Sequence, residues 1–331
     1  MNLDGKVLFD KDISLTSVLN KKVGIVGYGN QGRAQALNLR DSKIDVAVGL
    51  RQNSSSFNRL KEDGIRHMSI DDLIENSHII SLMIPDNRID SFLIDNMSKF
   101  KEDQTILVSH GYSIIYGSAK ISKNLNIVMV APSGGGKIVR SEYKKGFGVP
   151  ALVAVHQDFS GNSLDLTFAY AKAIGSSRAA VFKSTFKEEA ETDLFGEQVI
   201  LTGSIPLIII ESYKVLLEEG YDPVVSWFVC FYELKTIVNL IFDKGMESFY
   251  DMISSTARYG GISRGKKLID DEFKIKIKEI LKDIKSGHFK NELEESLSKG
   301  NDGKNELKKI FNSKEFTEVE NNLLNKIKKE D

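Results

Sequence analysis

Two acidic residues, Asp193 and Glu197, stand four positions apart at the start of a strongly apolar part of the sequence. Side chains four residues apart lie on one face of a helix, and the residues that follow, 199–201 and 205–210, are mostly apolar. A buried acid needs a cation, a proton or a metal ion as its partner, because an unpaired buried charge is strongly unfavourable. The two acids are therefore either metal ligands or helix N-terminal acids, stabilised by the helix dipole and by a nearby lysine or arginine.

Three glycines, Gly27, Gly29 and Gly32, form a G-x-G-x-x-G run between a strand-like apolar segment and a helix-like one. In this context the motif binds the pyrophosphate of a dinucleotide. Gly27 permits the tight turn, Gly29 lets the backbone approach the pyrophosphate, and Gly32 allows close packing of the helix. The helix N-terminus then holds the anion. The alternative is a glycine turn in another α/β fold.

The end of the next strand-like run favours NADPH over NADH. An NAD site usually has an acid at this point, which accepts hydrogen bonds from the ribose hydroxyls. This chain has Arg51 there instead, followed by Ser54, Ser55 and Ser56. A guanidinium with hydroxyl and backbone donors suits a 2′-phosphate. The alternative is a polar loop that contacts no cofactor.

The segments that must position these residues begin with an alternation of short apolar runs and amphipathic stretches. This alternation is typical of a doubly wound α/β sheet, and the apolar runs are typical of its buried parallel strands. The runs that we interpret as parallel strands are KVGIVGYG (22–29), DVAVGL (45–50), HIISLMIP (78–85), TILVSHG (105–111), NIVMVAP (126–132) and PALVAVH (150–156).

From about residue 185 the pattern changes to long helical stretches that follow one another, with breaks such as EEGYDP, DKG and YGGISRG. We therefore predict a Rossmann-type α/β domain over residues 1–184 and an all-helical domain over residues 185–331. The last portion, from Asp270, is rich in lysine and glutamate, which is typical of solvated amphipathic helices.

The composition of the 331-residue chain, 41% hydrophobic and 27% charged, is that of an ordinary soluble globular protein of about two domains. A formal net charge of −1 gives no argument for a nucleic-acid or membrane surface. The single cysteine, Cys230, excludes a disulfide framework and a cysteine-based zinc site. The apolar runs look too short and too interrupted to span a bilayer, and we find no signal peptide. We expect a cytoplasmic protein that acts on a small molecule.

These features together resemble ketol-acid reductoisomerase, the acetohydroxyacid isomeroreductase of branched-chain amino-acid synthesis, in its short form. The resemblance covers nearly the whole chain, and the last three of its segments are together highly specific. The segments are VGIVGYGNQGRAQALNLRDS (23–42), VAVGLR (46–51), IPD (84–86), SHGYSI (109–114), GFGVPALVAVHQD (146–158), TFKEEAETDLFGEQ (185–198) and YELKTIVNLIFDKG (232–245).

The resemblance implies a Rossmann domain and a knotted helical domain that is intertwined with a second subunit, so that the protein is a homodimer or a higher homo-oligomer. It also implies NADPH as the hydride donor and two magnesium ions, for which carboxylate and water oxygens are suitable ligands. In the family's reaction a magnesium-assisted alkyl shift converts a 2-hydroxy-2-alkyl-3-keto acid into a 3-hydroxy-2-keto acid, which NADPH then reduces. Two cations on the neighbouring oxygens stabilise the charge that develops during the shift.

The resemblance also assigns roles to individual residues. Asp193 and Glu197 match magnesium ligands, and the aspartate is shared by both ions. Glu233 matches a ligand, and Ser254 a substrate contact, that a partner subunit supplies. The predicted catalytic residues are His110, Asp193, Glu197, Glu233 and Ser254, and the predicted cofactor-binding residues are Gly27, Tyr28, Gly29, Asn30, Gln31, Gly32, Arg51, Ser54, Ser56, Pro85, Asp86, His110 and Gly136.

The segment SWFVCFYELK, residues 226–235, departs from the family pattern. The pattern has two glutamates four residues apart, which are Val229 and Glu233 here, and a histidine before the second glutamate, which is Tyr232 here. Valine cannot ligate a metal. We therefore predict one magnesium site at Asp193 and Glu197, and a second site, including Glu233, that has lost a ligand.

The segment VMVAPSGGGKIVR, residues 128–140, departs in a similar way. An active-site lysine of the family is Ser133 here, a proline is Gly135, and a histidine is Lys137. Farther along the chain, Arg258 replaces a glutamate and reverses its charge. The losses gather on the second metal and on the lysine, whereas the cofactor residues and the first pair of acids are intact.

Three functions are compatible with these retained and altered residues. The first is a repurposed NADPH-dependent reductase, which reduces a C=O or C=N group, such as a 2-keto acid or an imine, without the alkyl shift. The second is a working ketol-acid reductoisomerase in which Lys137 or a water molecule fills the altered site. The third is a catalytically dead NADPH-binding protein that acts through its partner interface. The retained acids and Ser254 argue against the third.

Overall fold

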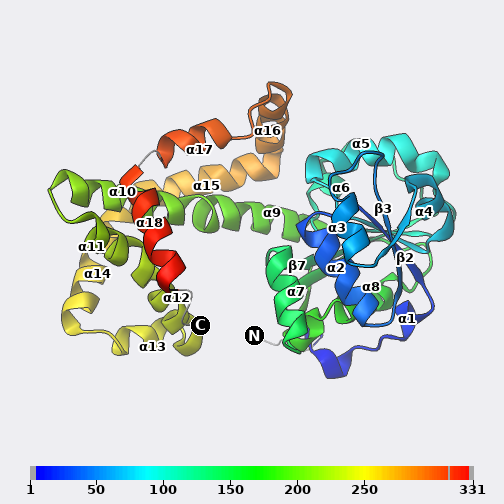
Figure 1. The fold of residues 1–331 in the computed structure, drawn as a ribbon, viewed down its shortest axis with the longest axis horizontal. Helices are drawn as coiled ribbons and strands as arrows, with labels where there is room; N and C mark the ends of the chain where they lie inside the picture. The colour runs from blue at the N-terminus through cyan, green and yellow to red at the C-terminus, as the bar shows by residue number, and fades with distance from the viewer. Residues whose placement is uncertain (1–4, 312–313, 328–331) are drawn as a thin grey trace. The chain divides into compact units, whose positions relative to one another are not determined.

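The computed structural model describes residues 5–311 and 314–327, and the chain divides into two compact units, Met1–Thr192 and Asp193–Asp331. The first unit is an α/β fold with a sheet flanked by helices, and the second is built of helices (Figure 1). The predicted fold class, a Rossmann-type α/β domain followed by a helical domain, is confirmed. The division falls inside a helix that begins at Phe186, and our boundary between residues 184 and 185 stays a prediction.

Among the described residues, nine strands form one sheet in the order β1-β9-β8-β7-β6-β5-β2-β3-β4. All neighbouring strands from β4 to β7 are parallel. Each of the six apolar runs forms a strand, and three short strands, β1, β4 and β9, were not predicted. The strands are β1 (Val7–Leu8), β2 (Lys22–Val26), β3 (Asp45–Gly49), β4 (Arg66–Met68), β5 (Ile79–Leu82), β6 (Thr105–Val108), β7 (Asn126–Pro132), β8 (Ala151–Gln157) and β9 (Val181–Lys183).

The direction of β8 corrects the prediction, because β8 pairs antiparallel with β7 and parallel with β9. The chain after β7 forms a helix and then returns to the end of β7. There Ser133, directly after β7, donates its backbone N–H to the carbonyl of Pro150, directly before β8, at 2.8 Å. Because β8 starts at the edge of the sheet where β7 ends, the two strands must run in opposite directions.

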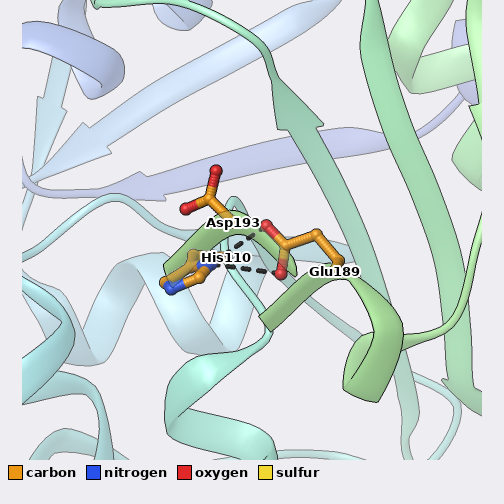
Figure 2. A group of neighbouring side chains, drawn as sticks. All are labelled: His110, Glu189 and Asp193. Carbon is orange, nitrogen blue, oxygen red and sulfur yellow. Dashed lines mark hydrogen bonds and ion pairs between the residues drawn. The ribbon is translucent and has the colours of Figure 1, made fainter. Parts of the chain in front are cut away.

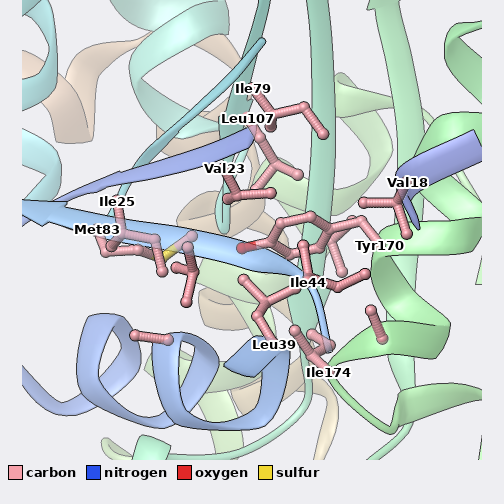
Figure 3. Packing of buried hydrophobic residues seen from close by; sticks show 14 of the residues in the cluster. Val18, Val23, Ile25, Leu39, Ile44, Ile79, Met83, Leu107, Tyr170 and Ile174 are labelled. Carbon is pink, nitrogen blue, oxygen red and sulfur yellow. The ribbon is translucent and has the colours of Figure 1, made fainter. Parts of the chain in front are cut away.

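The sheet is buried on both faces, which explains why its strands are continuous apolar runs. Successive residues of a strand point to opposite faces: Val23 and Ile25 belong to one buried cluster, whereas Val26 belongs to the other. Figure 3 shows the first cluster, in which Leu39 and Tyr170 approach Val23 and Ile25 from the helices.

The helices of the first unit lie between the strands in sequence, and α2 and α8 contribute Leu39 and Tyr170 to the first cluster. Ser69 is the N-cap of α4, where its side chain accepts a hydrogen bond from Asp72 N–H. The helices of this unit are α1 (Thr16–Leu19), α2 (Asn30–Asp41), α3 (Phe57–Glu62), α4 (Ile70–Asn76), α5 (Asp86–Asn96), α6 (Tyr112–Tyr116), α7 (Gly136–Lys144) and α8 (Ser163–Ala173), with short 3-10 turns at Asp10–Asp12, Met97–Lys99 and Ser176–Arg178.

The helical half contains two π-helical stretches, η4 and η5, each inserted between α-helices. Its described core is small and gathers around Ile210, Tyr213, Trp227 and Phe316. The elements are α9 (Phe186–Gly196), η4 (Glu197–Leu201), α10 (Ser204–Glu218), α11 (Pro223–Trp227), η5 (Phe228–Tyr232), α12 (Glu233–Lys244), α13 (Met246–Asp251), α14 (Ser255–Leu268), α15 (Asp271–Ser286), α16 (His288–Ser298), α17 (Lys304–Ile310) and α18 (Lys314–Ile327).

The helical half contains two long apolar helical stretches that are mostly not buried. Two stretches, Phe186–Glu218 and Pro223–Lys244, are long and apolar enough to cross a membrane, yet only 17% and 11% of their most apolar windows are buried. The expectation that the apolar runs are too short and interrupted was wrong, because η4 and η5 keep the helices continuous. Length and composition alone are weak evidence for a span, and a helix of a soluble protein's core passes the same test.

Candidate active site and cofactor cleft

The turn between β2 and α2 has the geometry expected of an anion-binding glycine loop. Gly27 has φ +96°, which side-chain-bearing residues rarely adopt. A Cβ on Gly32 would stand 2.4 Å from the backbone oxygen of Gly27, whereas a Cβ on Gly29 would meet no described atom within 4 Å. Gly29 is the N-cap of α2 and has no side chain to bind the first-turn N–H groups. These N–H groups can therefore bind a phosphate.

A polar bracket fixes this turn to the end of α3. Tyr28 donates its hydroxyl to Asp63 Oδ2 at 2.8 Å, and Arg33 donates to both carboxylate oxygens at 2.6 and 2.8 Å. The hydrogen bond from Arg33, followed by that from Tyr28, holds the pKa of Asp63 below its ordinary value despite partial burial. Burial and the bond to Asp63 raise the pKa of Tyr28. Tyr28 is therefore a neutral hydrogen-bond donor that anchors the loop.

A cleft of about 720 Å³ opens beside the glycine turn. One wall is the turn itself with the segment after β3, and the other is Ile84, Pro85 and one face of α5. Seven predicted cofactor residues line this one cleft: Gly27, Tyr28, Gly29, Arg51, Ser54, Ser56 and Pro85. A cavity of this size with a phosphate-binding loop at its edge and a guanidinium within it fits a phosphorylated dinucleotide.

The remaining predicted cofactor residues do not line this cleft. Gly136 is buried, and a Cβ on it would stand 1.9 Å from the backbone oxygen of Asn30. Gln31 Nε2 donates to the carbonyl oxygen of Gly134 at 2.8 Å. These contacts bring the starts of α7 and α2 together, so Gly136 packs the loop from behind. The residues outside the lining are Asn30, Gln31, Gly32, Asp86, His110 and Gly136.

His110, just after β6, is partly buried and pairs with the buried Glu189 of α9 (Figure 2). His110 Nδ1 lies 2.9 and 3.1 Å from the two carboxylate oxygens of Glu189, and Gly111 N–H donates to Glu189 Oε2 at 2.7 Å. The side chain of Glu189 is only 3% exposed. A carboxylate on Nδ1 sets the orientation and the tautomer of the imidazole.

Asp193 lies one helical turn after Glu189 on the same helix, so α9 itself sets the spacing of the two acids. The ligand atoms of His110, Glu189 and Asp193 lie within 4.8 Å of one another (Figure 2). Two carboxylates and an imidazole are donors that a divalent cation accepts. Glu189 accepts hydrogen bonds from His110 and Gly111, and Asp193 is the exposed carboxylate of the group.

The other predicted catalytic residues do not belong to this group. Glu197 is the first residue of η4 and is exposed. Glu233, the first residue of α12, is also exposed. Ser254 is the N-cap of α14, where its hydroxyl accepts from Ala257 N–H at 3.1 Å. The structure thus brings together His110 and Asp193 of the predicted set.

Glu189 is the residue of the site that the sequence analysis missed. It precedes Asp193 by four positions, the same spacing that drew attention to Asp193 and Glu197. Extending this spacing one turn toward the N-terminus would have identified Glu189 as the third acid on one face. Its pairing with His110, 79 positions away, had no sequence signal.

Among the residues that depart from the family pattern, Ser133, Lys137 and Val229 are exposed, whereas Tyr232 and Arg258 are partly buried. Ser133 follows β7 and Lys137 is the second residue of α7, and both are exposed. Val229 lies in η5 and is 45% exposed, beside the stacked rings of Phe228 and Tyr232, whose centroids are 5.4 Å apart. Residue 229 itself therefore presents an aliphatic side chain and offers no carboxylate.

Comparison with known proteins covers both units. Residues 17–180 match the family model "Acetohydroxy acid isomeroreductase, NADPH-binding domain", and residues 186–329 match "Ketol-acid reductoisomerase, C-terminal domain". A ketol-acid reductoisomerase (NADP(+)) of Methanocaldococcus jannaschii is 43% identical over 288 residues, which cover 87% of each chain. One of Sulfolobus acidocaldarius is 41% identical over 312 residues, which cover 94% of each chain.

A solved structure of the same family has the same fold as this chain. An NADH-preferring ketol-acid reductoisomerase from an uncultured archaeon superimposes with a TM-score of 0.91 at 32% identity, covering 96% of this chain and 98% of that one. The chain thus contains the NADPH-binding domain followed by the C-terminal domain of the family. The cleft described above lies in the first of these domains. The chain belongs to the ketol-acid reductoisomerase family and is an NADP-dependent oxidoreductase of that family.

Proposed function

We propose that this family member is a repurposed NADPH-dependent reductase, which transfers hydride to a C=O or C=N group, such as a 2-keto acid or an imine, without a preceding alkyl shift. The observation that carries the proposal is Val229, an aliphatic side chain four positions before Glu233, where the family pattern has a second glutamate. Two further features support the proposal. The aromatic rings of Phe228 and Tyr232 stack in the same π-helical stretch, and Ser133 replaces the family's lysine.

The chain's own residues divide the work of such a reduction. The glycine turn and the cleft bind NADPH, and Arg51, Ser54 and Ser56 bind its 2′-phosphate. His110, oriented by the buried Glu189, exchanges a proton at Nε2 with the reduced oxygen or nitrogen. Asp193, beside His110 and Glu189, and Glu197, one turn farther along the chain and outside that group, would hold one magnesium ion, which would supply Lewis-acid polarisation of a substrate oxygen.

The test compares two substrates on the same purified enzyme with NADPH and magnesium: 2-acetolactate, which needs the alkyl shift, and the preformed 3-hydroxy-2-keto acid, which does not. Removing one electrostatic stabiliser of a transition state typically lowers the rate by ~10²–10³. Losing two would approach ~10⁴, although neighbouring effects are rarely independent. We expect the preformed substrate to be reduced and acetolactate to be consumed at least ~10²-fold more slowly.

The second candidate is a working ketol-acid reductoisomerase of branched-chain amino-acid biosynthesis, with Lys137 or a water molecule in the altered site. The 43% identity to curated members over 87% of the chain favours it. Under this alternative both substrates are consumed at comparable rates, which contradicts our proposal. A catalytically dead NADPH-binding protein would consume neither substrate and would also contradict it.

The cofactor preference is a separate part of the proposal. A charge-assisted contact to the 2′-phosphate stabilises binding by about 1.5–3 kcal/mol, which is roughly a ten- to a hundred-fold difference in Kd. We therefore expect NADPH to bind more tightly than NADH by this factor in fluorescence titrations. A structural neighbour in the same family prefers NADH, so either cofactor is possible for this family. Equal affinities for NADPH and NADH would refute the preference.

We further propose that two copies pair through their helical units, in the intertwined and knotted arrangement that the family resemblance implies. The exposed apolar side chains of α10, η5 and α12, among them Phe242 at 88% exposure, support a covering partner. A cytoplasmic dimer then buries these helices, and no membrane is needed. Light scattering that shows a folded monomer at micromolar concentration, or co-flotation with lipid vesicles, would overturn this proposal.

A further inference from the structure

Three cationic side chains line the cofactor cleft, and the protein neutralises one of them. Lys99 Nζ donates to Asp71 Oδ1 at 2.6 Å and to Asn96 Oδ1 at 2.9 Å. Arg51 and Arg88 make no side-chain hydrogen bond or ion pair with the described part of the chain. The cleft therefore contains two guanidinium charges without a protein counter-ion.

Arg88 belongs to the face of α5 that forms the second wall of the cleft. Arg88, Ser91, Phe92 and Asp95 line the cleft at positions i, i+3, i+4 and i+7 of this helix. Asp95 is the other acid of this wall, but seven residues correspond to about 10 Å along a helix axis. Asp95 is thus too far along the helix to pair with Arg88.

The position of Arg88 within α5 is unfavourable in the free protein. Arg88 is the third residue of the helix, and the N-terminal end of a helix carries partial positive charge that disfavours a cation. A residue placed against its local preference is often a functional one. An anion in the cleft would be attracted by both the guanidinium of Arg88 and the helix end.

We propose that Arg88 is a second 2′-phosphate-binding residue, which grips the phosphate of NADPH from the α5 wall while Arg51 grips it from the opposite wall. This inference rests on the cofactor part of the proposed function. A phosphate group carries nearly two negative charges at neutral pH, which two guanidinium groups balance. The planar fork of arginine matches the geometry of phosphate oxygens, and Ser54 and Ser56 line the same cleft as hydroxyl donors.

The experiment measures the binding of NADPH and NADH to the full-length protein and to the variants Arg88→Gln, Arg88→Lys and Arg51→Gln. Arg59→Gln is the matched control, because Arg59 is an exposed arginine of α3 that does not line the cleft. Adenosine 2′,5′-bisphosphate and adenosine 5′-monophosphate, titrated calorimetrically, report on the phosphate without the nicotinamide. The thermal unfolding midpoint of each variant checks that the fold is intact.

We expect Arg88→Gln to raise the Kd for NADPH and for the bisphosphate by about ten- to a hundred-fold. The Kd for NADH and for the monophosphate should change by less than about two-fold. Arg88→Lys should keep part of the affinity, because the charge stays and the fork is lost. Unchanged NADPH affinity in Arg88→Gln would overturn the inference. Equal weakening of both cofactors would also overturn it, because Arg88 would then contact the adenine. If the wild-type protein does not prefer NADPH, the cofactor part of the proposed function fails first.

Discussion

The two units of this chain differ in whether the predicted site residues of each unit lie together. The α/β unit buries both faces of its sheet and gathers seven of the predicted cofactor residues in one cleft. In the helical half, the predicted residues Glu197, Glu233 and Ser254 are exposed and stand outside the described ligand group. Apolar side chains as large as Phe242 are also exposed there.

We infer from this difference that cofactor binding depends on the α/β unit alone, whereas catalysis also depends on the pairing of two copies. The α/β unit positions its nucleotide loop through its own contacts, such as the bracket of Tyr28, Arg33 and Asp63. The helical half instead leaves large apolar side chains such as Phe242 exposed. We therefore expect NADPH binding to survive changes that abolish turnover or pairing, and the following predictions separate these properties.

The largest expected effect is on turnover. Replacing Glu189 with Gln keeps the size of the side chain but puts an amide where the carboxylate meets His110 Nδ1. Because proton transfer by a positioned side chain contributes about 10²–10⁴-fold, we expect kcat to fall within this range while the Kd for NADPH stays within about two-fold. Steady-state kinetics and cofactor titration measure the two quantities. A large loss of NADPH affinity would mean that Glu189 supports the fold rather than the chemistry.

The next effect is on pairing. Phe242→Asp places a charge on the exposed apolar face of α12. Interface hot spots contribute about 2 kcal/mol or more, which is roughly a thirty-fold change in the dimer Kd. Light scattering across a dilution series should show dissociation, with NADPH binding kept. Thr236→Asp is the control and should stay paired, because Thr236 is an exposed polar residue of the same helix whose position six residues before Phe242 puts it on a different face.

A third effect concerns the fold around the glycine loop. A Cβ on Gly136 would stand 1.9 Å from the backbone oxygen of Asn30, whereas one on the neighbouring Gly135 would meet no described atom within 4 Å. We expect Gly136→Ala to destabilise the protein by about 1–3 kcal/mol, as overpacking does, and to weaken NADPH. Denaturant unfolding of Gly135→Ala should match the wild type. Equal stability of both variants would show that α7 shifts without strain.

The smallest effect is the pH dependence of the loop bracket. Hydrogen bonds from Arg33 and Tyr28 hold the pKa of Asp63 below the ordinary value of 3.8. The bracket therefore stabilises the fold fully above about pH 4 and loses this contribution as the pH falls through the lowered pKa. Because Arg33 is 43% exposed, solvent screening limits the contribution to about 1 kcal/mol or less. Asp63→Asn should be less stable than the wild type at pH 7, and the difference should shrink near pH 3.

The sequence predicted most of the α/β unit because its signals are local. Short continuous apolar runs identified six strands, and the G-x-G-x-x-G spacing identified the turn at Gly27. The direction of β8 was missed, because it depends on a hydrogen bond between Ser133 and Pro150. The partnership of His110 and Glu189 was also missed, because it joins positions 79 residues apart.

The helical half was harder to predict because its local signals conflict with its tertiary structure. The glycines of YGGISRG indicated a break, but they lie inside α14, Ser255–Leu268. Gly260 and Gly261 are weak helix formers, yet the helix continues through them. The π-helical stretches at Glu197 and before Glu233 have no sequence signature, although such stretches are frequent at functional sites.

We propose that the alkyl shift has been lost through the replacement of two family residues by Val229 and Ser133. The most direct measurement is the ratio of acetolactate turnover to the turnover of the preformed 3-hydroxy-2-keto acid, in the wild type and in the double variant Ser133→Lys/Val229→Glu. We predict a ratio near zero in the wild type and a rise of at least ~10²-fold in the double variant, because both restored groups stabilise the developing charge. A wild-type ratio near one would contradict the account.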